Sequence, residues 1–135
     1  MKTPNLAYVI EDDPITSTIT ELIIKKKLMC NKVQKYANGQ PAFEQLTAAL
    51  RNETSMPDLI LLDLNMPVMD GWEFLDAITD LSITKQVCVF ILTSSINPDD
   101  IKKSESYEGV KGYFSKPLDN RNVARMQVLY QEVAP

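Results

Sequence analysis

The sequence of 135 residues contains no histidine. The chain therefore cannot use imidazole as a base, a metal ligand or its own phosphate carrier, and any histidine chemistry must come from a partner. Cysteine is scarce too, with only Cys30 and Cys88. Because Cys88 falls within a continuous apolar run, we expect it to act as a small core residue. A chain of this length needs no disulfide or structural metal to bury a core.

Long apolar runs and an excess of positive charge are also missing. No run approaches the length of a membrane span, and the first residues lack the layout of a signal peptide. The net charge of −4 has the wrong sign for binding nucleic acid over the whole surface. We therefore expect a cytoplasmic protein with no membrane association and no direct nucleic-acid partner. Residues 1–135 are predicted to form one domain without an output domain.

Strand-like and helix-like patterns alternate along the chain, which is typical of an α/β fold with a parallel sheet. The predicted strands are residues 6–10, 32–36, 59–62, 87–92 and 111–115, with the polar second strand nearer an edge. The first helix is predicted to begin at Pro14, with Asp13 as N-cap. Its predicted buried face consists of Ile15, Ile19, Leu22 and Ile23.

The other helices are predicted from similar signals. Their expected core residues are Phe43, Leu46 and Leu50 in the second, Phe74, Leu75 and Ile78 in the third, and Val123, Met126, Leu129, Tyr130 and Val133 in the last. The fourth helix follows Asn97 and has few apolar residues beyond Ile101 and Tyr107. Such a thinly anchored helix is expected to shift or to meet a partner.

Polar side chains stand where the predicted strands end. Asp63 closes an apolar run, Glu11 and Asp12 follow the first strand, and Thr93 and Lys116 follow the last two. The carboxyl ends of parallel strands line one crevice, so these groups are expected to meet there. Carboxylates about 5 Å apart repel by roughly 3 kcal/mol. A bound cation would offset this repulsion most simply. Oxygen ligands of this kind suit Mg²⁺ or Mn²⁺.

This set of residues predicts phosphoryl chemistry at Asp63. A carboxylate beside Mg²⁺ can attack a phosphoryl group and form an aspartyl phosphate. The transfer needs donors for the phosphoryl oxygens, which Thr93 and Lys116 would supply. Taken singly, the acids after the first strand would suit a helix N-terminus, Thr93 a backbone contact and Lys116 a solvated surface. The combination favours the phosphoryl site.

The chain resembles the receiver domain of two-component response regulators from Leu6 to the last helix. The motifs that carry the resemblance are Val9-Ile10-Glu11-Asp12-Asp13-Pro14, the segment from Pro57 through Asp63 to Gly71, Leu92-Thr93-Ser94, and Gly112-Tyr113-Phe114-Ser115-Lys116-Pro117. The resemblance implies a stand-alone receiver with a flavodoxin-like fold, in which a five-stranded parallel sheet of order 2-1-3-4-5 has five helices on its faces. It also implies a signalling switch that hydrolyses its phosphate slowly, and not a turnover enzyme.

The resemblance further implies roles for single residues. Asp63 matches the phosphoacceptor, Glu11 and Asp12 match the acidic pair that holds Mg²⁺, and Asn65 matches the residue whose backbone carbonyl completes the metal site. Other matched positions are the switch hydroxyl Thr93, the switch aromatic Tyr113, the phosphate-pairing Lys116 and the cis-proline Pro117. Glu11 departs from the commoner aspartate, and Ser94 from a smaller residue.

Three alternatives remain for comparison. An aspartyl phosphohydrolase of the haloacid-dehalogenase kind would carry an acid where this chain has Asn65. A flavin or nucleotide carrier on the same fold would carry a glycine-rich cradle after the first strand. A pseudo-receiver would bind partners without phosphorylation.

The resemblance implies a histidine kinase or a histidine phosphotransfer protein as phosphodonor. Output is expected through a downstream protein or a second copy of the chain. The docking face would be formed by the helix after Asn97, the strand 111–115 and the helix after Asp119. Five basic residues would favour an acidic partner there, with solvating charges as the alternative: Lys102, Lys103, Lys111, Arg121 and Arg125.

Overall fold

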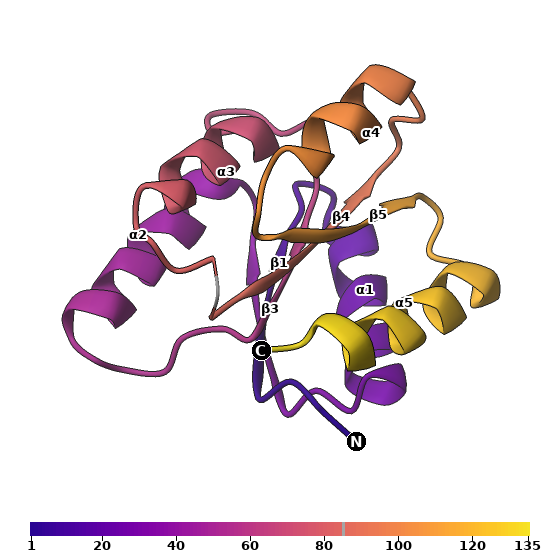
Figure 1. Ribbon diagram of the computed structural model, residues 1–135, viewed down its shortest axis with the longest axis horizontal. Helices are drawn as coiled ribbons and strands as arrows, with labels where there is room; N and C mark the ends of the chain where they lie inside the picture. The colour runs from indigo at the N-terminus through magenta and orange to yellow at the C-terminus, as the bar shows by residue number, and fades with distance from the viewer. Residues whose placement is uncertain (85) are drawn as a thin grey trace.

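Five parallel strands form a single sheet with helices on both faces (Figure 1) in the computed structural model, which describes residues 1–84 and 86–135. The strands are β1 (Leu6–Ile10), β2 (Lys32–Tyr36), β3 (Leu59–Leu62), β4 (Cys88–Thr93) and β5 (Val110–Ser115). The helices are α1 (Pro14–Lys27), α2 (Gly39–Arg51), α3 (Gly71–Thr79), α4 (Pro98–Glu105) and α5 (Asn120–Val133). The strand order β2-β1-β3-β4-β5 confirms the predicted flavodoxin-like fold.

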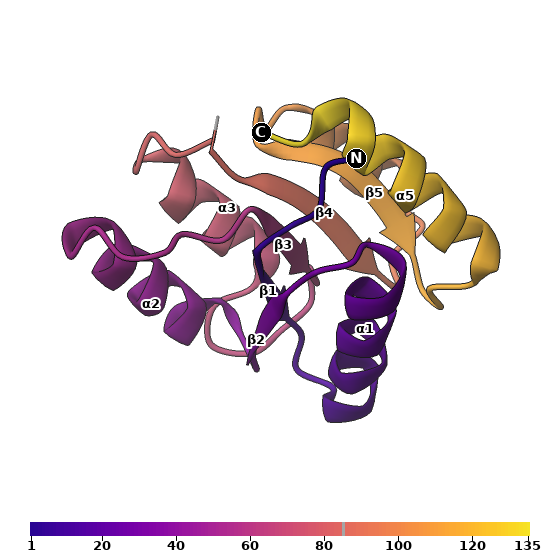
Figure 2. The same ribbon diagram turned by 90° about the horizontal axis from the view of Figure 1, so that it is seen from below.

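The sheet separates two hydrophobic cores. Figures 1 and 2 show α1 and α5 on one side of the sheet and α2 and α3 on the other. Alternate residues of each central strand therefore enter opposite cores, as Tyr8 and Val9 of β1 do. The strands β1, β3 and β4 are buried along their whole length, whereas β2 is partly exposed at its edge position, as predicted.

The helix starts follow the capping signals of the sequence. Asp13, Asn38, Asp70, Asn97 and Asp119 are the N-caps, and the side chain of each accepts a hydrogen bond from a backbone N–H of the first turn. Asp70 and Glu73 also form a reciprocal capping box. These caps fix the points at which the chain leaves the carboxyl edge of the sheet and enters each helix.

The predicted buried face of α1 is wrong. Ile15, Ile19 and Leu22 are 71%, 51% and 62% exposed, and Ile23 is half-buried. The residues of α1 that face the sheet are instead Ser17, Thr20 and Ile24. Small polar side chains suit this position because the helix begins over the polar end of β1, where Thr20 lies beside Glu11 and Asp63. The helix therefore presents an aliphatic stripe to solvent.

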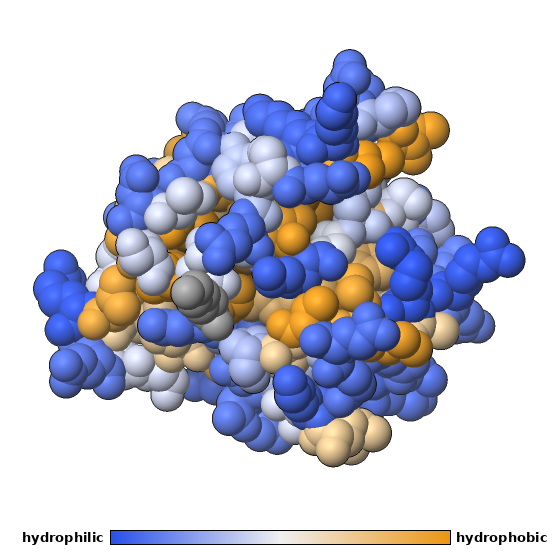
Figure 3. All heavy atoms as spheres, viewed as in Figure 1, coloured by the Kyte–Doolittle hydropathy of each residue, from blue (hydrophilic) through white to orange (hydrophobic). Residues whose placement is uncertain are grey.

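The other helices agree better with the expected patterns. The core residues predicted for α3 are all buried, and in α5 Val123, Met126 and Tyr130 are buried. In α2, Leu46 is buried but Leu50 is 38% exposed. Helix α4 buries only Ser104, which confirms its thin anchoring. The face in Figure 3 is mainly hydrophilic with smaller apolar patches, and no described helix is long and apolar enough to cross a membrane.

Candidate functional site

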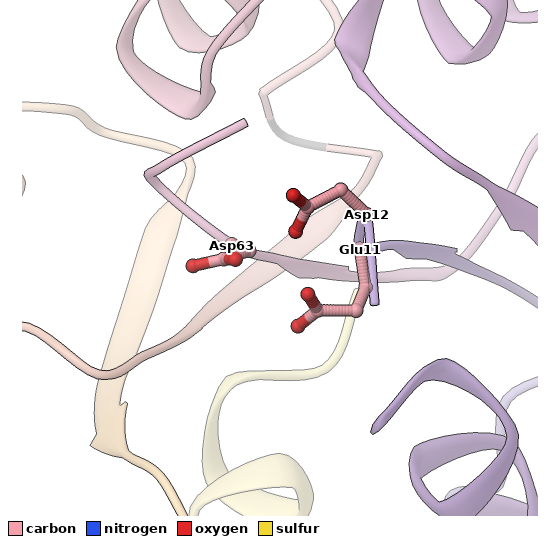
Figure 4. A group of neighbouring side chains, drawn as sticks. All are labelled: Glu11, Asp12 and Asp63. Atoms are coloured by element: carbon pink, nitrogen blue, oxygen red, sulfur yellow. The ribbon is translucent and has the colours of Figure 1, made fainter. Parts of the chain in front are cut away.

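Strands β1 and β3 bring three carboxylates together at the carboxyl edge of the sheet. Ile10 pairs with Leu62, so the residues that follow them, Glu11 and Asp63, leave adjacent strands at the same level. One carboxylate oxygen from each of Glu11, Asp12 and Asp63 lies within 4.8 Å of the others. Figure 4 shows the three carboxylates projecting to the same side of the strand ends. Glu11 and Asp63 are buried, whereas Asp12 is exposed.

Lys116 supplies the positive charge inside this cluster. Its Nζ lies 2.5 Å from Oε1 of Glu11 and 3.2 Å from Oδ2 of Asp63. The backbone N–H of Lys116 donates to the carbonyl oxygen of Thr93 at 2.8 Å, which fixes the start of its loop to the end of β4. The bond from Lys116 to Pro117 is a cis peptide. The other carboxylate oxygen of Asp63, Oδ1, accepts from the backbone N–H of Leu64 at 2.8 Å.

Burial and mutual charge shift the pKa values of two of these groups. Burial raises the pKa of Glu11 to about 7, helped by the charge of Asp63 and opposed by the contacts with Lys116 and with the backbone of Asp13. Burial alone would lower the pKa of Lys116, but the hydrogen bond to Glu11 and the charges of Asp63 and Glu11 outweigh it and raise the pKa. The ammonium is therefore firmly protonated, whereas Glu11 can accept a proton near neutrality.

The donor set suits a divalent metal ion. Three carboxylates converge at a solvent-accessible edge, and oxygen ligands with room for water are those that Mg²⁺ and Mn²⁺ prefer. Asn65 lies two residues after Asp63 and is exposed, between the buried residues Leu64 and Met66. Its carbonyl would complete the site as the resemblance implies. Glu11, Asp12 and Asp63 are thus the residues that would hold the ion.

Thr93, Tyr113 and Ser95 form a connected group beside the acids. Thr93 ends β4 with its side chain fully buried, and its Oγ1 accepts from the backbone N–H of Ser95 at 3.4 Å. The hydroxyl of Tyr113 donates to the carbonyl oxygen of Ser95 at 2.9 Å. Ser95 Oγ in turn donates to Asp100 of α4 at 2.6 Å. Sequence reasoning missed Ser95, whose only signal was its position two residues after Thr93.

The loop between β3 and α3 is tightly built. Val68 has a φ of 70° and is 79% exposed, a rare backbone state for a β-branched residue. At Gly71, a Cβ atom would lie 2.5 Å from the carbonyl oxygen of Asp63, so only glycine fits. The first turn of α3 therefore packs directly against the backbone of Asp63.

Two of the five basic residues predicted on the output face contact aromatic rings. Nζ of Lys103 lies 4.4 Å from the ring centroid of Trp72, and the guanidinium of Arg125 lies 4.2 Å from that of Phe114. Arg125 also donates to the carbonyl oxygen of Tyr113 at 2.7 Å. Lys102, Lys111 and Arg121 are exposed. In the predicted basic patch, Lys103 and Arg125 therefore also make contacts within the protein, in addition to presenting charge.

The chain belongs to the response regulator receiver domain family, since the model of that family matches residues 7–127. Response regulator Rcp1 of Synechocystis sp. is 31% identical over 125 residues, which cover 91% of this chain and 84% of Rcp1. The nitrate/nitrite response regulator NarL of Escherichia coli is 29% identical over 131 residues, which cover 97% of this chain and 56% of NarL. The chain thus spans little more than half of this longer relative.

Solved structures agree with this assignment. A two-component response regulator from Cytophaga hutchinsonii superposes with a TM-score of 0.84 at 28% identity, covering 98% of both chains. The Mn²⁺-bound form of Rcp1 gives a TM-score of 0.74 at 25% identity, covering 94% of this chain and 92% of Rcp1. The chain is therefore a receiver domain of two-component signalling, which disfavours the phosphohydrolase and cofactor-carrier alternatives.

Proposed function

We propose that Asp63 accepts a phosphoryl group from a phosphohistidine on a partner protein. The observation that carries the proposal is the cluster itself, in which three carboxylate oxygens lie within 4.8 Å and Lys116 contacts two of the acids. A carboxylate oxygen of Asp63 attacks phosphorus and forms an O–P bond. The P–N bond of the donor breaks, and its electron pair stays on the imidazole nitrogen. The chain has no histidine, so the phosphohistidine must belong to a partner protein. That partner would be a histidine kinase or a histidine phosphotransfer protein.

Glu11, Asp12 and Asp63 would bind Mg²⁺, with the carbonyl of Asn65 as a further ligand. When bound, Mg²⁺ neutralises charge on the phosphoryl oxygens. Lys116 holds a positive charge 3.2 Å from Oδ2 of Asp63 and would pair with another phosphoryl oxygen. The hydroxyl of Thr93 would move onto a third. Slow attack by water on the aspartyl phosphate would return Asp63 to its free form.

The signal would leave through the face formed by α4, β5 and α5. The hydroxyl of Tyr113 donates a hydrogen bond to the carbonyl oxygen of Ser95, in the loop after β4. The hydroxyl of Ser95 donates a hydrogen bond to Asp100 of α4. Movement of Thr93 toward the phosphoryl group would pull on the backbone of Ser95 and thereby shift the ring of Tyr113, whose hydroxyl is hydrogen-bonded to it. A downstream protein or a second copy of the chain would recognise the rearranged face.

The phosphodonor would dock across the beginning of α1. Asp63 is buried at the bottom of the carboxyl edge, so a protein that reaches it must cover the surrounding rim. Ile15 on α1, Val68 in the loop after β3 and Ile96 in the loop after β4 follow strand ends and are 71%, 79% and 77% exposed. Ile19 and Leu22 continue an exposed aliphatic stripe along α1 from Ile15. Such a stripe would suit a protein-binding surface.

Intact-mass measurement tests the acceptor. The wild-type chain, incubated with acetyl phosphate and Mg²⁺, should gain the mass of one phosphoryl group, and it should gain none when EDTA is present. Asp63→Asn should gain none under either condition, whereas Asp58→Asn, which changes an acid before β3, should react like wild type. An adduct that persists in Asp63→Asn would overturn the assignment. Failure of the wild type to react with any donor would favour the pseudo-receiver alternative.

A further inference from the structure

Helix α4 packs on β5 with little buried side-chain surface, and polar and aromatic contacts hold its two ends. It buries only Ser104, so core packing contributes little to its position. At its start, Asp100 accepts from Ser95 Oγ at 2.6 Å. Just beyond its end, the Tyr107 ring stacks on the indole of Trp72 from α3, with centroids 6.0 Å apart and planes inclined by 26°. The first attachment belongs to the Thr93 and Tyr113 switch, whereas the second has no part in it.

Two further contacts make the second attachment specific. The Tyr107 hydroxyl donates to Oδ1 of Asp76, one turn along α3 from Trp72, at 2.6 Å. Nζ of Lys103, on α4, lies 4.4 Å from the centroid of the opposing Trp72 ring system. Trp72 thus contacts both the Tyr107 ring and the Lys103 ammonium from the region of α4. Figure 1 shows α3 and α4 on the same side of the sheet, so side chains of this length can bridge them.

Trp72 is also next to the residue that couples α3 to the acceptor. Gly71 leaves no space between the first turn of α3 and the carbonyl oxygen of Asp63, and its N–H donates to the carbonyl oxygen of Leu64 at 2.9 Å. The capping box of Asp70 and Glu73 fastens the preceding loop to the same turn. A displacement of the Asp63 backbone would therefore be expected to move the first turn of α3, which carries Trp72.

We propose that the Trp72–Tyr107 stack is a latch that holds α4 in the arrangement of this structure, and that phosphorylation of Asp63 opens it through the first turn of α3. The proposal rests on the function proposed for Asp63 and adds a second route to α4, parallel to that through Thr93 and Tyr113. A contact that forms in only one of two states stabilises that state by some factor. By linkage, it lowers the affinity of any ligand that binds the other state by the same factor. An aromatic pair of this kind corresponds to a factor of roughly two to ten.

Beryllofluoride with Mg²⁺, a mimic of the aspartyl phosphate, serves as the probe. Trp72→Leu and Tyr107→Leu should each bind it roughly two- to tenfold more tightly than wild type. The double variant should gain no more than either single one, because the two rings make one contact. Tyr107→Phe keeps the stack and loses only the bond to Asp76, so its gain should be smaller. Phe43→Leu, a half-buried aromatic change on α2, is the control and should leave the affinity unchanged.

Fluorescence gives an independent readout, because Trp72 is the only tryptophan in the chain. Beryllofluoride should change its emission in the wild type, and Tyr107→Leu should show the changed emission before the probe is added. Affinities that match the Phe43→Leu control, or wild-type emission unmoved by saturating probe, would overturn the latch while leaving Asp63 as acceptor. If the wild type binds no beryllofluoride, both the acceptor assignment and the latch built on it fail.

Discussion

At the level of single residues, charge balance governs the site. Lys116 contacts the carboxylates of both Glu11 and Asp63, while Asp12 is exposed. A divalent cation held by the acids would compete with the ammonium for the same oxygens. Metal affinity and the protonation of the acids are therefore linked.

Replacing Asp12 with asparagine should weaken Mg²⁺ binding by roughly tenfold or more, because a charged ligand is lost. The melting temperature of the metal-free protein should stay equal or rise, since repulsion among the acids is relieved. Calorimetric titration with Mg²⁺ and thermal melts in EDTA measure the two effects. Asp80→Asn, an exposed acid at the end of α3, is the matched control. Equal Mg²⁺ affinity in Asp12→Asn and wild type would place the metal elsewhere.

The raised pKa of Glu11 predicts a pH dependence of stability. The pKa is about 7 in the folded protein and 4.5 in the unfolded chain, so the folded state binds more protons between these values. The free energy of unfolding of the metal-free protein should therefore fall as the pH rises from about 4.5 to 7. Glu11→Gln should remove this slope, as urea unfolding at a series of pH values would show. A slope retained in Glu11→Gln would assign it to another group.

Val68 should be a site where a substitution stabilises the protein. Its φ of 70° places a β-branched residue in the left-handed region, which asparagine tolerates far better. Val68→Asn should raise the free energy of unfolding by about 0.5–1 kcal/mol, as measured by urea denaturation. Val128→Asn changes an exposed valine inside α5 and should not stabilise. A Val68→Asn protein less stable than wild type would show that the valine side chain has a structural contact that outweighs the strain.

At the level of elements, α1 combines an inward polar face with an outward aliphatic one. Ile19→Glu should reduce phosphotransfer from a protein donor at least about tenfold, because a charge is placed within the docking surface. Reaction with acetyl phosphate should be unchanged, since a small donor needs no docking. Purified phosphohistidine proteins are first compared by their rate of phosphotransfer to the wild-type chain. The fastest of them serves as the donor in this experiment.

Val128→Glu is the control for the docking surface. Val128 is 63% exposed on α5, so the same chemical change is made on a helix other than α1. Equal losses in Ile19→Glu and Val128→Glu, or no loss in either, would remove α1 as the docking element. Loss of the acetyl phosphate reaction in Ile19→Glu would point to damage at Asp63 itself.

At the level of the whole molecule, the proposed donor surface and the proposed output face use different helices. The donor surface is proposed to begin on α1 and the output face to comprise α4, β5 and α5, of which α5 packs beside α1. Lys103 and Arg125 are poor probes of that face, because their contacts with Trp72 and Phe114 also hold the structure together. Lys102 and Lys111 are exposed and test it more cleanly.

Charge reversal at Lys102 and Lys111 should therefore weaken partner binding or dimerisation of the phosphorylated chain, since an acidic partner would lose its complement. Phosphorylation of Asp63 should be unaffected. Sedimentation of the beryllofluoride-treated protein measures dimerisation, and Lys26→Glu with Lys27→Glu on α1 is the matched control. If only the α1 variants weaken assembly, the output face lies on α1.

The sequence alone determined the fold and the composition of the candidate site. Alternating apolar strands and capped helices predict the parallel sheet, and the carboxyl ends of parallel strands must share one edge. The grouping of Glu11, Asp12, Asp63, Thr93 and Lys116 could therefore be predicted from the sequence, because their positions follow from backbone topology. The family model matches residues 7–127, the span that contains these five residues.

Only the tertiary structure decided which faces are buried and which side chains touch. Periodicity placed Ile15, Ile19 and Leu22 inward, but the helix packs over a polar strand end, so Ser17 and Thr20 fit there instead. The stack of Trp72 on Tyr107 joins residues far apart in the sequence, and no local pattern encodes such a pair. Local patterns specify elements, whereas helix orientation and side-chain contacts depend on the shape of the surface on which each element packs.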